Sequence, residues 1–121
     1  MRFSIAARLK SFRYAFGGLA YMLRTQHNAW LHLIATIVVV VAGLALKLRG
    51  EDWRWLVVAI VLVWTAETVN TAFEHLCDVV SPEFHASVQK SKDIAAGAVL
   101  ICVIGAVIIG LQVFVPYLLG R

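Results

Sequence analysis

Three long apolar segments dominate the pattern of hydrophobic and polar positions along the chain. They cover about residues 29–47, 53–75 and 93–119. A helix needs roughly 20 mostly apolar residues to cross about 30 Å of hydrocarbon, and each segment is long enough. Strands of a membrane β-barrel are shorter, about 9–11 residues, and alternate in polarity. The three segments do neither, so the pattern predicts three transmembrane helices.

The N-terminal segment, about residues 3–24, has a different pattern. Apolar residues recur there at mixed spacings of three and four. Basic residues fill the positions between them: Arg2, Arg8, Lys10, Arg13 and Arg24. This spacing is typical of a basic amphipathic helix in the membrane interface, with a plain juxtamembrane anchor as the alternative. We expect no signal peptide, because charged residues interrupt the position of its apolar region.

The composition excludes soluble and disordered classes. Hydrophobic residues make up 61% of the 121 residues and charged residues 15%, against about 45–50% and about 25% in soluble domains. A small soluble domain cannot bury that much apolar surface, and disordered chains are poor in apolar residues. We therefore expect a single all-α membrane domain over residues 1–121. The net charge of +4 does not indicate nucleic acid, because Lys and Arg flanking membrane spans give the same excess.

Lys and Arg are divided unequally between the two expected sides of the membrane. The N-terminal segment and the loop 77–93 hold seven: Arg2, Arg8, Lys10, Arg13, Arg24, Lys90 and Lys92. The other side holds four: Lys47, Arg49, Arg54 and Arg121. The positive-inside rule therefore places the N-terminus in the cytoplasm.

Polar residues form a stripe within and beyond the second apolar segment. The stripe residues stand at offsets 0, 3, 4, 7 and 11: Glu67, Asn70, Thr71, Glu74 and Asp78. At about 100° per residue these positions share one face of a helix. Ionisable groups inside a span cost at least about 2.5–3.5 kcal/mol each near its centre and usually mark function.

Two further polar clusters are expected at the same membrane boundary. The first apolar segment opens with Gln26, His27, Asn28 and His32, and the third with Lys92 and Asp93. Mg²⁺ commonly binds one or two carboxylates together with substrate phosphates. A second carboxylate can act as a general base, and a lysine can neutralise phosphate charge. The set therefore fits phosphoryl transfer between a nucleotide and a lipid hydroxyl.

Other interpretations of these residues stay open. Glu67 alone is compatible with an interhelical hydrogen bond or with a proton carrier, as in a small proton-coupled transporter. Such transporters usually have four spans and carry the Glu in the first, whereas Glu67 lies in the second of three. A non-catalytic membrane assembly protein, such as a holin, would not need this set of polar residues at one depth.

Two sequence blocks carry a resemblance to a known family. Residues 67–74, ETVNTAFE, look like the signature E-x-x-N-[ST]-A-x-E, and Asp78 follows them. Residues 91–99, SKDIAAGAV, are similar to the block A-K-D-x-A-A-G-A-V, and residues 12–19, 25–28 and 81–85 also fit. In these features the chain resembles the small bacterial integral-membrane lipid kinases, diacylglycerol kinase and undecaprenol kinase.

The resemblance implies an activity and an assembly. It implies a homotrimer in the bacterial inner membrane, with active sites shared between subunits. It implies Mg²⁺-dependent transfer of the ATP γ-phosphate to a lipid alcohol, with diacylglycerol and undecaprenol both left open. In this family pattern Glu67 would be the general base, Asn70 would orient it, and Glu74 would bind the metal.

The same resemblance implies the nucleotide contacts. Lys92 and Asp93 would contact phosphates and ribose or structure their surroundings. Secondary contacts would come from Arg8, Arg13 and Asn28. Gln26 stands where many diacylglycerol kinases have a metal-binding Glu, so it would coordinate through a neutral carbonyl oxygen.

Overall fold

The computed structural model describes residues 2–120 and consists of four helices. They are α1 (Ile5–Thr25), α2 (His27–Ala45), α3 (Gly50–Val80) and α4 (Ala86–Leu118). The last three are long and apolar enough to cross a membrane. There is no strand among the described residues. The predicted all-α fold with three membrane helices is therefore confirmed.

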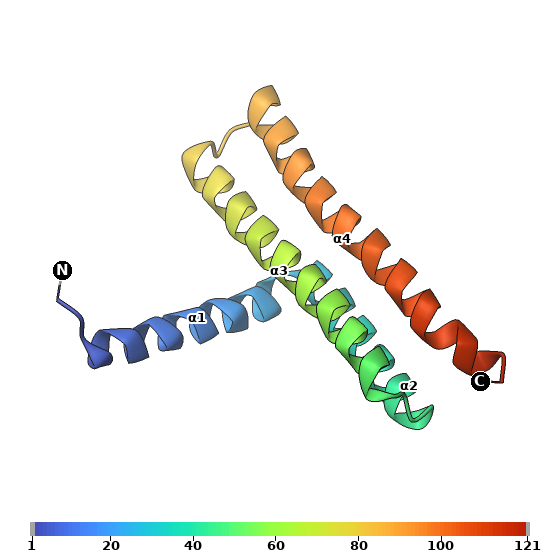
Figure 1. Cartoon of the computed structure of the whole chain (residues 1–121). Coiled ribbons are helices and arrows are strands. Elements are labelled where there is room, and N and C mark those ends of the chain that lie inside the picture. Colours follow the sequence, from blue (N-terminus) through green and yellow to red (C-terminus); the bar gives the residue numbers. More distant parts are fainter. Residues whose placement is uncertain (1, 121) are drawn as a thin grey trace.

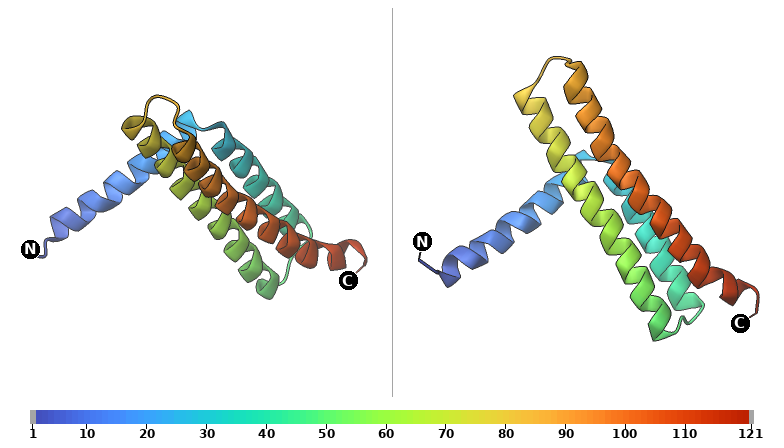
Figure 2. Two further views of the ribbon diagram at one scale, coloured as in Figure 1. Left: turned by 90° about the horizontal axis from the view of Figure 1, so that it is seen from above. Right: turned by 45° about the horizontal axis from the view of Figure 1, so that its top comes forward.

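The three long helices lie side by side, and α1 leaves them at a steep angle (Figures 1 and 2). Successive helices of the bundle run antiparallel, since short connections join α2 to α3 and α3 to α4. Close to its C-terminal end α1 meets the bundle, where Met22 is buried. The N-terminal part of α1 projects away from the bundle, as a helix lying along a membrane surface would.

Local sequence sets the ends of the helices. The Ser4 hydroxyl caps α1 by accepting a hydrogen bond from the Ala7 N–H at 3.3 Å. Gln26 has extended backbone angles and separates α1 from α2. Lys47 adopts a left-handed conformation with φ of 53° in the turn before α3. Pro82 follows Ser81 directly after α3, and a proline disfavours helix in the residue before it.

Both α3 and α4 extend beyond the predicted spans 53–75 and 93–119. α3 continues to Val80, and α4 already begins at Ala86. Hydropathy marks only the apolar part of a helix, whereas the backbone stays helical through the polar turns until Pro82 breaks it. The 31 residues of α3 would measure about 46 Å at 1.5 Å per residue, longer than the roughly 30 Å of hydrocarbon. The polar ends of α3 and α4 therefore project past the start of α2 (Figure 1).

A small apolar core lies at the opposite end of the bundle. Leu48, Leu56 and Val113 are buried there, and Trp53 packs against them. The Tyr117 hydroxyl ties α4 to the first turn of α3 by donating to Asp52 Oδ2 at 2.6 Å. These contacts hold the end of α4 against the start of α3, so the two long helices stay in register along their length.

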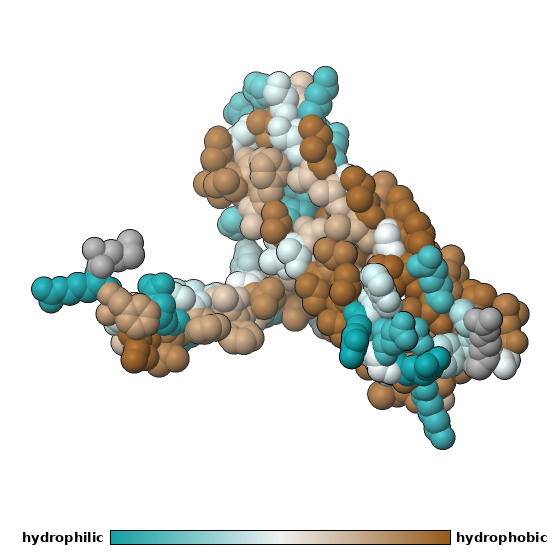
Figure 3. Space-filling view, in the orientation of Figure 1, coloured by the Kyte–Doolittle hydropathy of each residue, from teal (hydrophilic) through white to brown (hydrophobic). Residues whose placement is uncertain are grey.

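Most other large apolar side chains are exposed (Figure 3). Of the most apolar window of α4, no residue is buried inside the chain. A soluble protein rarely exposes a contiguous apolar patch larger than a few hundred Å². The surface therefore agrees with a protein whose helices face lipid or further subunits.

Candidate functional site

The polar stripe of α3 runs from the middle of the bundle to its projecting end. Glu67 and Asn70 are buried, Glu74 is half-buried and Asp78 is exposed. Asp78 lies eleven positions after Glu67, which corresponds to about 16 Å along the helix. The residues expected at one membrane boundary are therefore distributed along the helix, and the side-chain contacts gather them into two groups.

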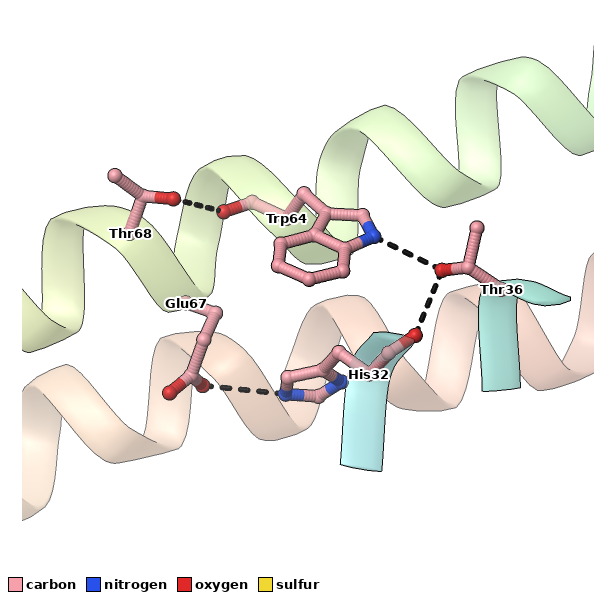
Figure 4. Close-up of polar contacts among 5 residues, drawn as sticks. All are labelled: His32, Thr36, Trp64, Glu67 and Thr68. Atoms are coloured by element: carbon pink, nitrogen blue, oxygen red, sulfur yellow. Dashed lines mark hydrogen bonds and ion pairs between the residues drawn. The ribbon is translucent and has the colours of Figure 1, made fainter. Parts of the chain in front are cut away.

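The first group is centred on the Glu67 carboxylate, which is only 2% exposed. Its Oε2 lies 3.2 Å from Nε2 of His32 on α2 (Figure 4). A buried carboxylate is costly unless it is paired and hydrogen-bonded, and His32 supplies the partner. The other carboxylate oxygen points away from the imidazole (Figure 4).

A second hydrogen bond joins the same two helices beside this pair. The Trp64 indole Nε1 donates to the Thr36 hydroxyl at 2.9 Å, and this hydroxyl donates to the His32 carbonyl at 2.7 Å (Figure 4). The Trp64 and His32 rings meet edge to face, with centroids 6.3 Å apart. The His32 side chain therefore contacts two residues of α3: Glu67 through its Nε2 atom and Trp64 through its ring.

Two buried oxygens lie one turn further along α3. Asn70 Oδ1 and Thr71 Oγ1 have no hydrogen-bond partner within residues 2–120. Buried polar atoms are usually satisfied, so each unpaired one calls for an explanation, and a bound ion or substrate group is one of them. Glu74 follows Asn70 after four residues on the same helical face.

The second group lies at the projecting end, where Lys92 Nζ donates to Asp78 Oδ1 at 2.8 Å. Lys92 precedes the apolar part of α4, which begins at Ile94. The hydrogen bond to the Asp78 carboxylate raises the pKa of the Lys92 ammonium above its usual value. Asp93 Oδ1 accepts a hydrogen bond from Gln89 Nε2 at 3.0 Å and remains exposed. This end thus presents a lysine that is charged at neutral pH.

The remaining predicted site residues lie elsewhere in the chain. Gln26 is half-buried at the junction of α1 and α2, and Asn28 is exposed in the first turn of α2. Arg8 and Arg13 are exposed on the part of α1 that projects from the bundle (Figure 1). A single chain therefore does not bring these arginines to the polar end of α3 and α4.

The prediction gave no role to three residues that contribute to the site, Thr36, Trp64 and His32, although it counted His32 in the polar cluster at the start of the first span. The sequence places His32 as an ionisable residue inside an apolar span, which is itself a signal of function. Its pairing with Glu67 depends on the register of α2 against α3. Trp64 has a specific hydrogen-bond partner on α2, the Thr36 hydroxyl.

An apolar groove runs between α1 and the later half of α3, beside the polar stripe. Its volume is about 690 Å³, and its walls include Gly18, Met22, Thr71, Ala72 and Leu76. Thr71 belongs both to this groove and to the polar stripe. The groove therefore brings an apolar surface within one helical turn of Glu67.

Comparison with known proteins identifies the family. A family model described as prokaryotic diacylglycerol kinase matches residues 13–114. The chain is 38% identical to the diacylglycerol kinase of Synechocystis sp. over 113 residues, which are 93% of this chain and 65% of that protein. It is 34% identical to the undecaprenol kinase of Bacillus subtilis over 109 residues, which are 90% of this chain and 89% of that protein.

A third relative is the diacylglycerol kinase of Escherichia coli strain K12, with 32% identity over 75 residues, or 62% of each chain. The matched part spans just under two thirds of the Synechocystis protein and most of the Bacillus protein. The matched residues 13–114 contain the whole polar stripe, His32 and the Lys92–Asp78 pair. The chain belongs to the prokaryotic diacylglycerol kinase family.

Proposed function

We propose that this protein is a lipid kinase that transfers the γ-phosphate of ATP to the hydroxyl of a membrane lipid in a Mg²⁺-dependent reaction. Family membership supports phosphoryl transfer from a nucleotide, and the three apolar helices support a lipid acceptor. The observation that carries the proposal is a buried carboxylate, Glu67, halfway along a membrane helix, with a polar stripe leading from it to Lys92. The relatives named above are kinases, so the comparisons give no support to a proton-coupled transporter.

Glu67 is the general base of the proposed reaction. Its carboxylate takes the proton of the lipid hydroxyl while the hydroxyl oxygen forms a bond to the γ-phosphorus. The bond from that phosphorus to the β–γ bridging oxygen breaks, and ADP leaves. A positioned base of this kind contributes roughly 10²–10⁴-fold to a rate. Asn70, on the next turn, orients the reacting group.

The oxygen donors near Glu74 fit a magnesium ion. Mg²⁺ prefers oxygen ligands and commonly takes one or two carboxylates together with substrate phosphates. Asn70 Oδ1, buried and unpaired within the described residues, is an available oxygen of this kind on the helical turn before Glu74. Glu74 and Gln26 would hold the ion, which when bound neutralises phosphate charge. Within residues 2–120 no three His, Cys, Asp or Glu side chains gather into a metal cluster, so phosphates and water would complete its shell.

The nucleotide binds at the projecting end in this proposal. Lys92 supplies a positive charge for the phosphates, with Asp78 holding its ammonium in place. Asp93 and Asn28 contribute polar contacts. Arg8 and Arg13 lie in the first half of α1, which projects from the bundle, and in this proposal they contact a nucleotide that is bound to a neighbouring subunit. A homotrimer with sites shared between subunits provides that arrangement.

The lipid binds in the groove between α1 and α3, with its hydroxyl directed to Glu67. The groove is apolar and large enough for part of an acyl or prenyl chain. The names of the relatives favour diacylglycerol or undecaprenol as the acceptor. We place the protein in the bacterial inner membrane, with its N-terminus and the 81–85 loop in the cytoplasm where ATP is found.

A lipid panel tests the proposal. Purified protein in detergent or bicelles is incubated with labelled Mg-ATP and with diacylglycerol, undecaprenol or monoacylglycerol, and the extracted lipids are separated. We expect a labelled phospholipid or prenyl phosphate with at least one acceptor. ATP hydrolysis without any labelled lipid would contradict the proposal.

A further inference from the structure

His32 has no part in the mechanism described so far, yet it makes the principal contact to the buried carboxylate. Within the described residues, the Glu67 carboxylate makes its hydrogen bond to His32, at 3.2 Å. A carboxylate that acts as a base must be ionised and can then only accept hydrogen bonds, so in that state Nε2 of His32 donates. The contact occupies Oε2 and leaves the other carboxylate oxygen directed away from the ring (Figure 4).

The position of His32 is set by a frame of two helices. His32 and Thr36 are one turn apart on α2, and Trp64 and Glu67 are three residues apart on α3. Because residues at these spacings share a helix face, two antiparallel pairs form: His32 with Glu67, and Thr36 with Trp64. The Thr36–Trp64 bond lies beside the His32–Glu67 contact and joins the same two helices.

The cavity beside His32 adds no second charge from the described residues that line it. The partner of His32 on α3 is Glu67, and His32 also lines this cavity of about 100 Å³ between α2, α3 and α4. The other walls of that cavity carry no titratable side chain; from α4 they are Ala106 and Gly110. An apolar surrounding of low dielectric strengthens the hydrogen bond between the two side chains.

We infer that His32 is a positioning residue for Glu67: it holds one carboxylate oxygen so that the other faces the lipid hydroxyl. The inference rests on the proposed function, because it gives Glu67 the role of base. A base must lie within hydrogen-bond reach of the proton that it removes. A carboxylate without its His32 contact turns about its side-chain bonds and loses that alignment, and a misplacement of about 1 Å can cost about 100-fold in rate.

The test compares two substitutions of His32. His32→Gln keeps an N–H donor, and His32→Leu removes it while leaving an apolar side chain of similar size. We expect His32→Leu to lower kcat by about 10- to 100-fold with an unchanged KM for Mg-ATP. His32→Gln should keep kcat within about fivefold of the native protein, since a donor still reaches the carboxylate. Thr36→Val is the matched control, because it disturbs the neighbouring pair without touching Glu67 directly.

A double-mutant cycle separates positioning from general support of the fold. If His32 acts through Glu67, adding His32→Leu to Glu67→Gln lowers kcat by less than about threefold further. If His32 only supports the fold, the kcat losses of His32→Leu and Glu67→Gln multiply in the double variant. Thr36→Val then lowers kcat as much as His32→Leu does. Either of these results would overturn the inference.

Different results would contradict the proposed role of Glu67 as the base and the proposed role of His32. Full activity in Glu67→Gln contradicts the proposed base, whereas a large loss in Glu67→Gln with full activity in His32→Leu contradicts only the role of His32. If His32→Leu does not fold, His32→Gln decides: a folded protein, with a native thermal midpoint and a kcat as low as that of Glu67→Gln, would overturn the positioning role.

Discussion

At the scale of single residues, the polar stripe of α3 divides into parts with different surroundings. Glu67 is buried against α2 and paired with His32, whereas Glu74 is half-buried and stands two turns closer to the projecting end. Glu74 lies seven positions after Glu67, a rise of about 10 Å along the helix. That separation suits a base near the lipid and a metal ligand near the phosphates. Substitutions of Glu67 and Glu74 should therefore have different effects on the kinetics.

Glu74→Gln tests the metal-binding part of this division. The substitution keeps the size of the side chain but removes the negative charge that a magnesium ion favours. We expect the apparent Mg-ATP concentration for half-maximal rate to rise about tenfold or more, with a smaller change in kcat. Activity titrations in Mg-ATP measure both, and the native protein and Glu67→Gln are the references. An unchanged Mg-ATP dependence would remove Glu74 from the metal site.

Gln26 provides a second test at this scale. A neutral ligand gives the site one negative charge fewer than a glutamate would, so the ATP phosphates must supply more of the charge that compensates the ion. Metal and nucleotide should then bind together, and free Mg²⁺ should bind weakly. Gln26→Glu should raise the affinity for free Mg²⁺, shown as a lower magnesium requirement at fixed ATP. Superimposable magnesium curves for the two proteins would mean that residue 26 is not near the metal.

At the scale of helices, one end of the bundle determines how α2, α3 and α4 are aligned. This tight end is the one that holds the apolar core of Leu48, Leu56 and Val113. Gly43 of α2 is closely packed: a Cβ atom added to it would lie 2.7 Å from the ring of Trp53 and 3.0 Å from the side chain of Leu48. The close approach brings α2 against the start of α3. Because α2 runs antiparallel to α3 from this point, the alignment here also sets which residues of α2 meet Glu67 further along.

Gly43→Ala should therefore destabilise the protein. Trp53 would have to move to admit the methyl group, and overpacking of this kind typically costs about 1–3 kcal/mol. Thermal unfolding in detergent should show a lower midpoint. Gly105→Ala in α4 is the control, because a Cβ atom there meets nothing within 4 Å, and its midpoint should be native or higher. Equal midpoints for the native protein and Gly43→Ala would show that the contact with Trp53 is not tight.

Helix type and number followed from the sequence, but the pairing of residues between helices did not. The apolar segments revealed three spans because each is long and nearly free of charge. Their ends were less clear, since hydropathy does not report the polar turns that carry α3 on to Val80. His32 and Glu67 were both visible as polar residues inside spans, yet their contact requires the register of α2 on α3. The Lys92–Asp78 pair likewise depends on how the 81–85 loop places the start of α4 against the end of α3.

At the scale of the whole molecule, one chain holds part of the proposed site and leaves other parts remote. Glu67, Asn70, Glu74 and Lys92 lie along α3 and the start of α4, whereas Arg8 and Arg13 project outward on α1. Large apolar surfaces remain exposed on the bundle, α4 included (Figure 3). Both features favour an assembly in which neighbouring copies complete each site within the membrane.

The proposed orientation in the membrane can be tested by cysteine labelling. With Cys77 and Cys102 replaced by Ala, single cysteines are introduced as Glu51→Cys at the tight end and Glu83→Cys in the 81–85 loop. Both positions are exposed. The excess of Lys and Arg near the N-terminus and the loop predicts that a membrane-impermeant reagent labels Glu51→Cys from outside intact cells. Labelling of Glu83→Cys from outside would reverse the topology.

Phosphoryl transfer to a lipid through the buried carboxylate is the central claim, and the rate of Glu67→Gln tests it most directly. The turnover of labelled phosphate from Mg-ATP to the best lipid acceptor is measured at saturating substrates in the native protein and in Glu67→Gln. Because a general base contributes roughly 10²–10⁴-fold, kcat should fall by at least about 100-fold while the KM for Mg-ATP stays the same. A folded Glu67→Gln protein that phosphorylates lipid within a few-fold of the native rate would contradict the account.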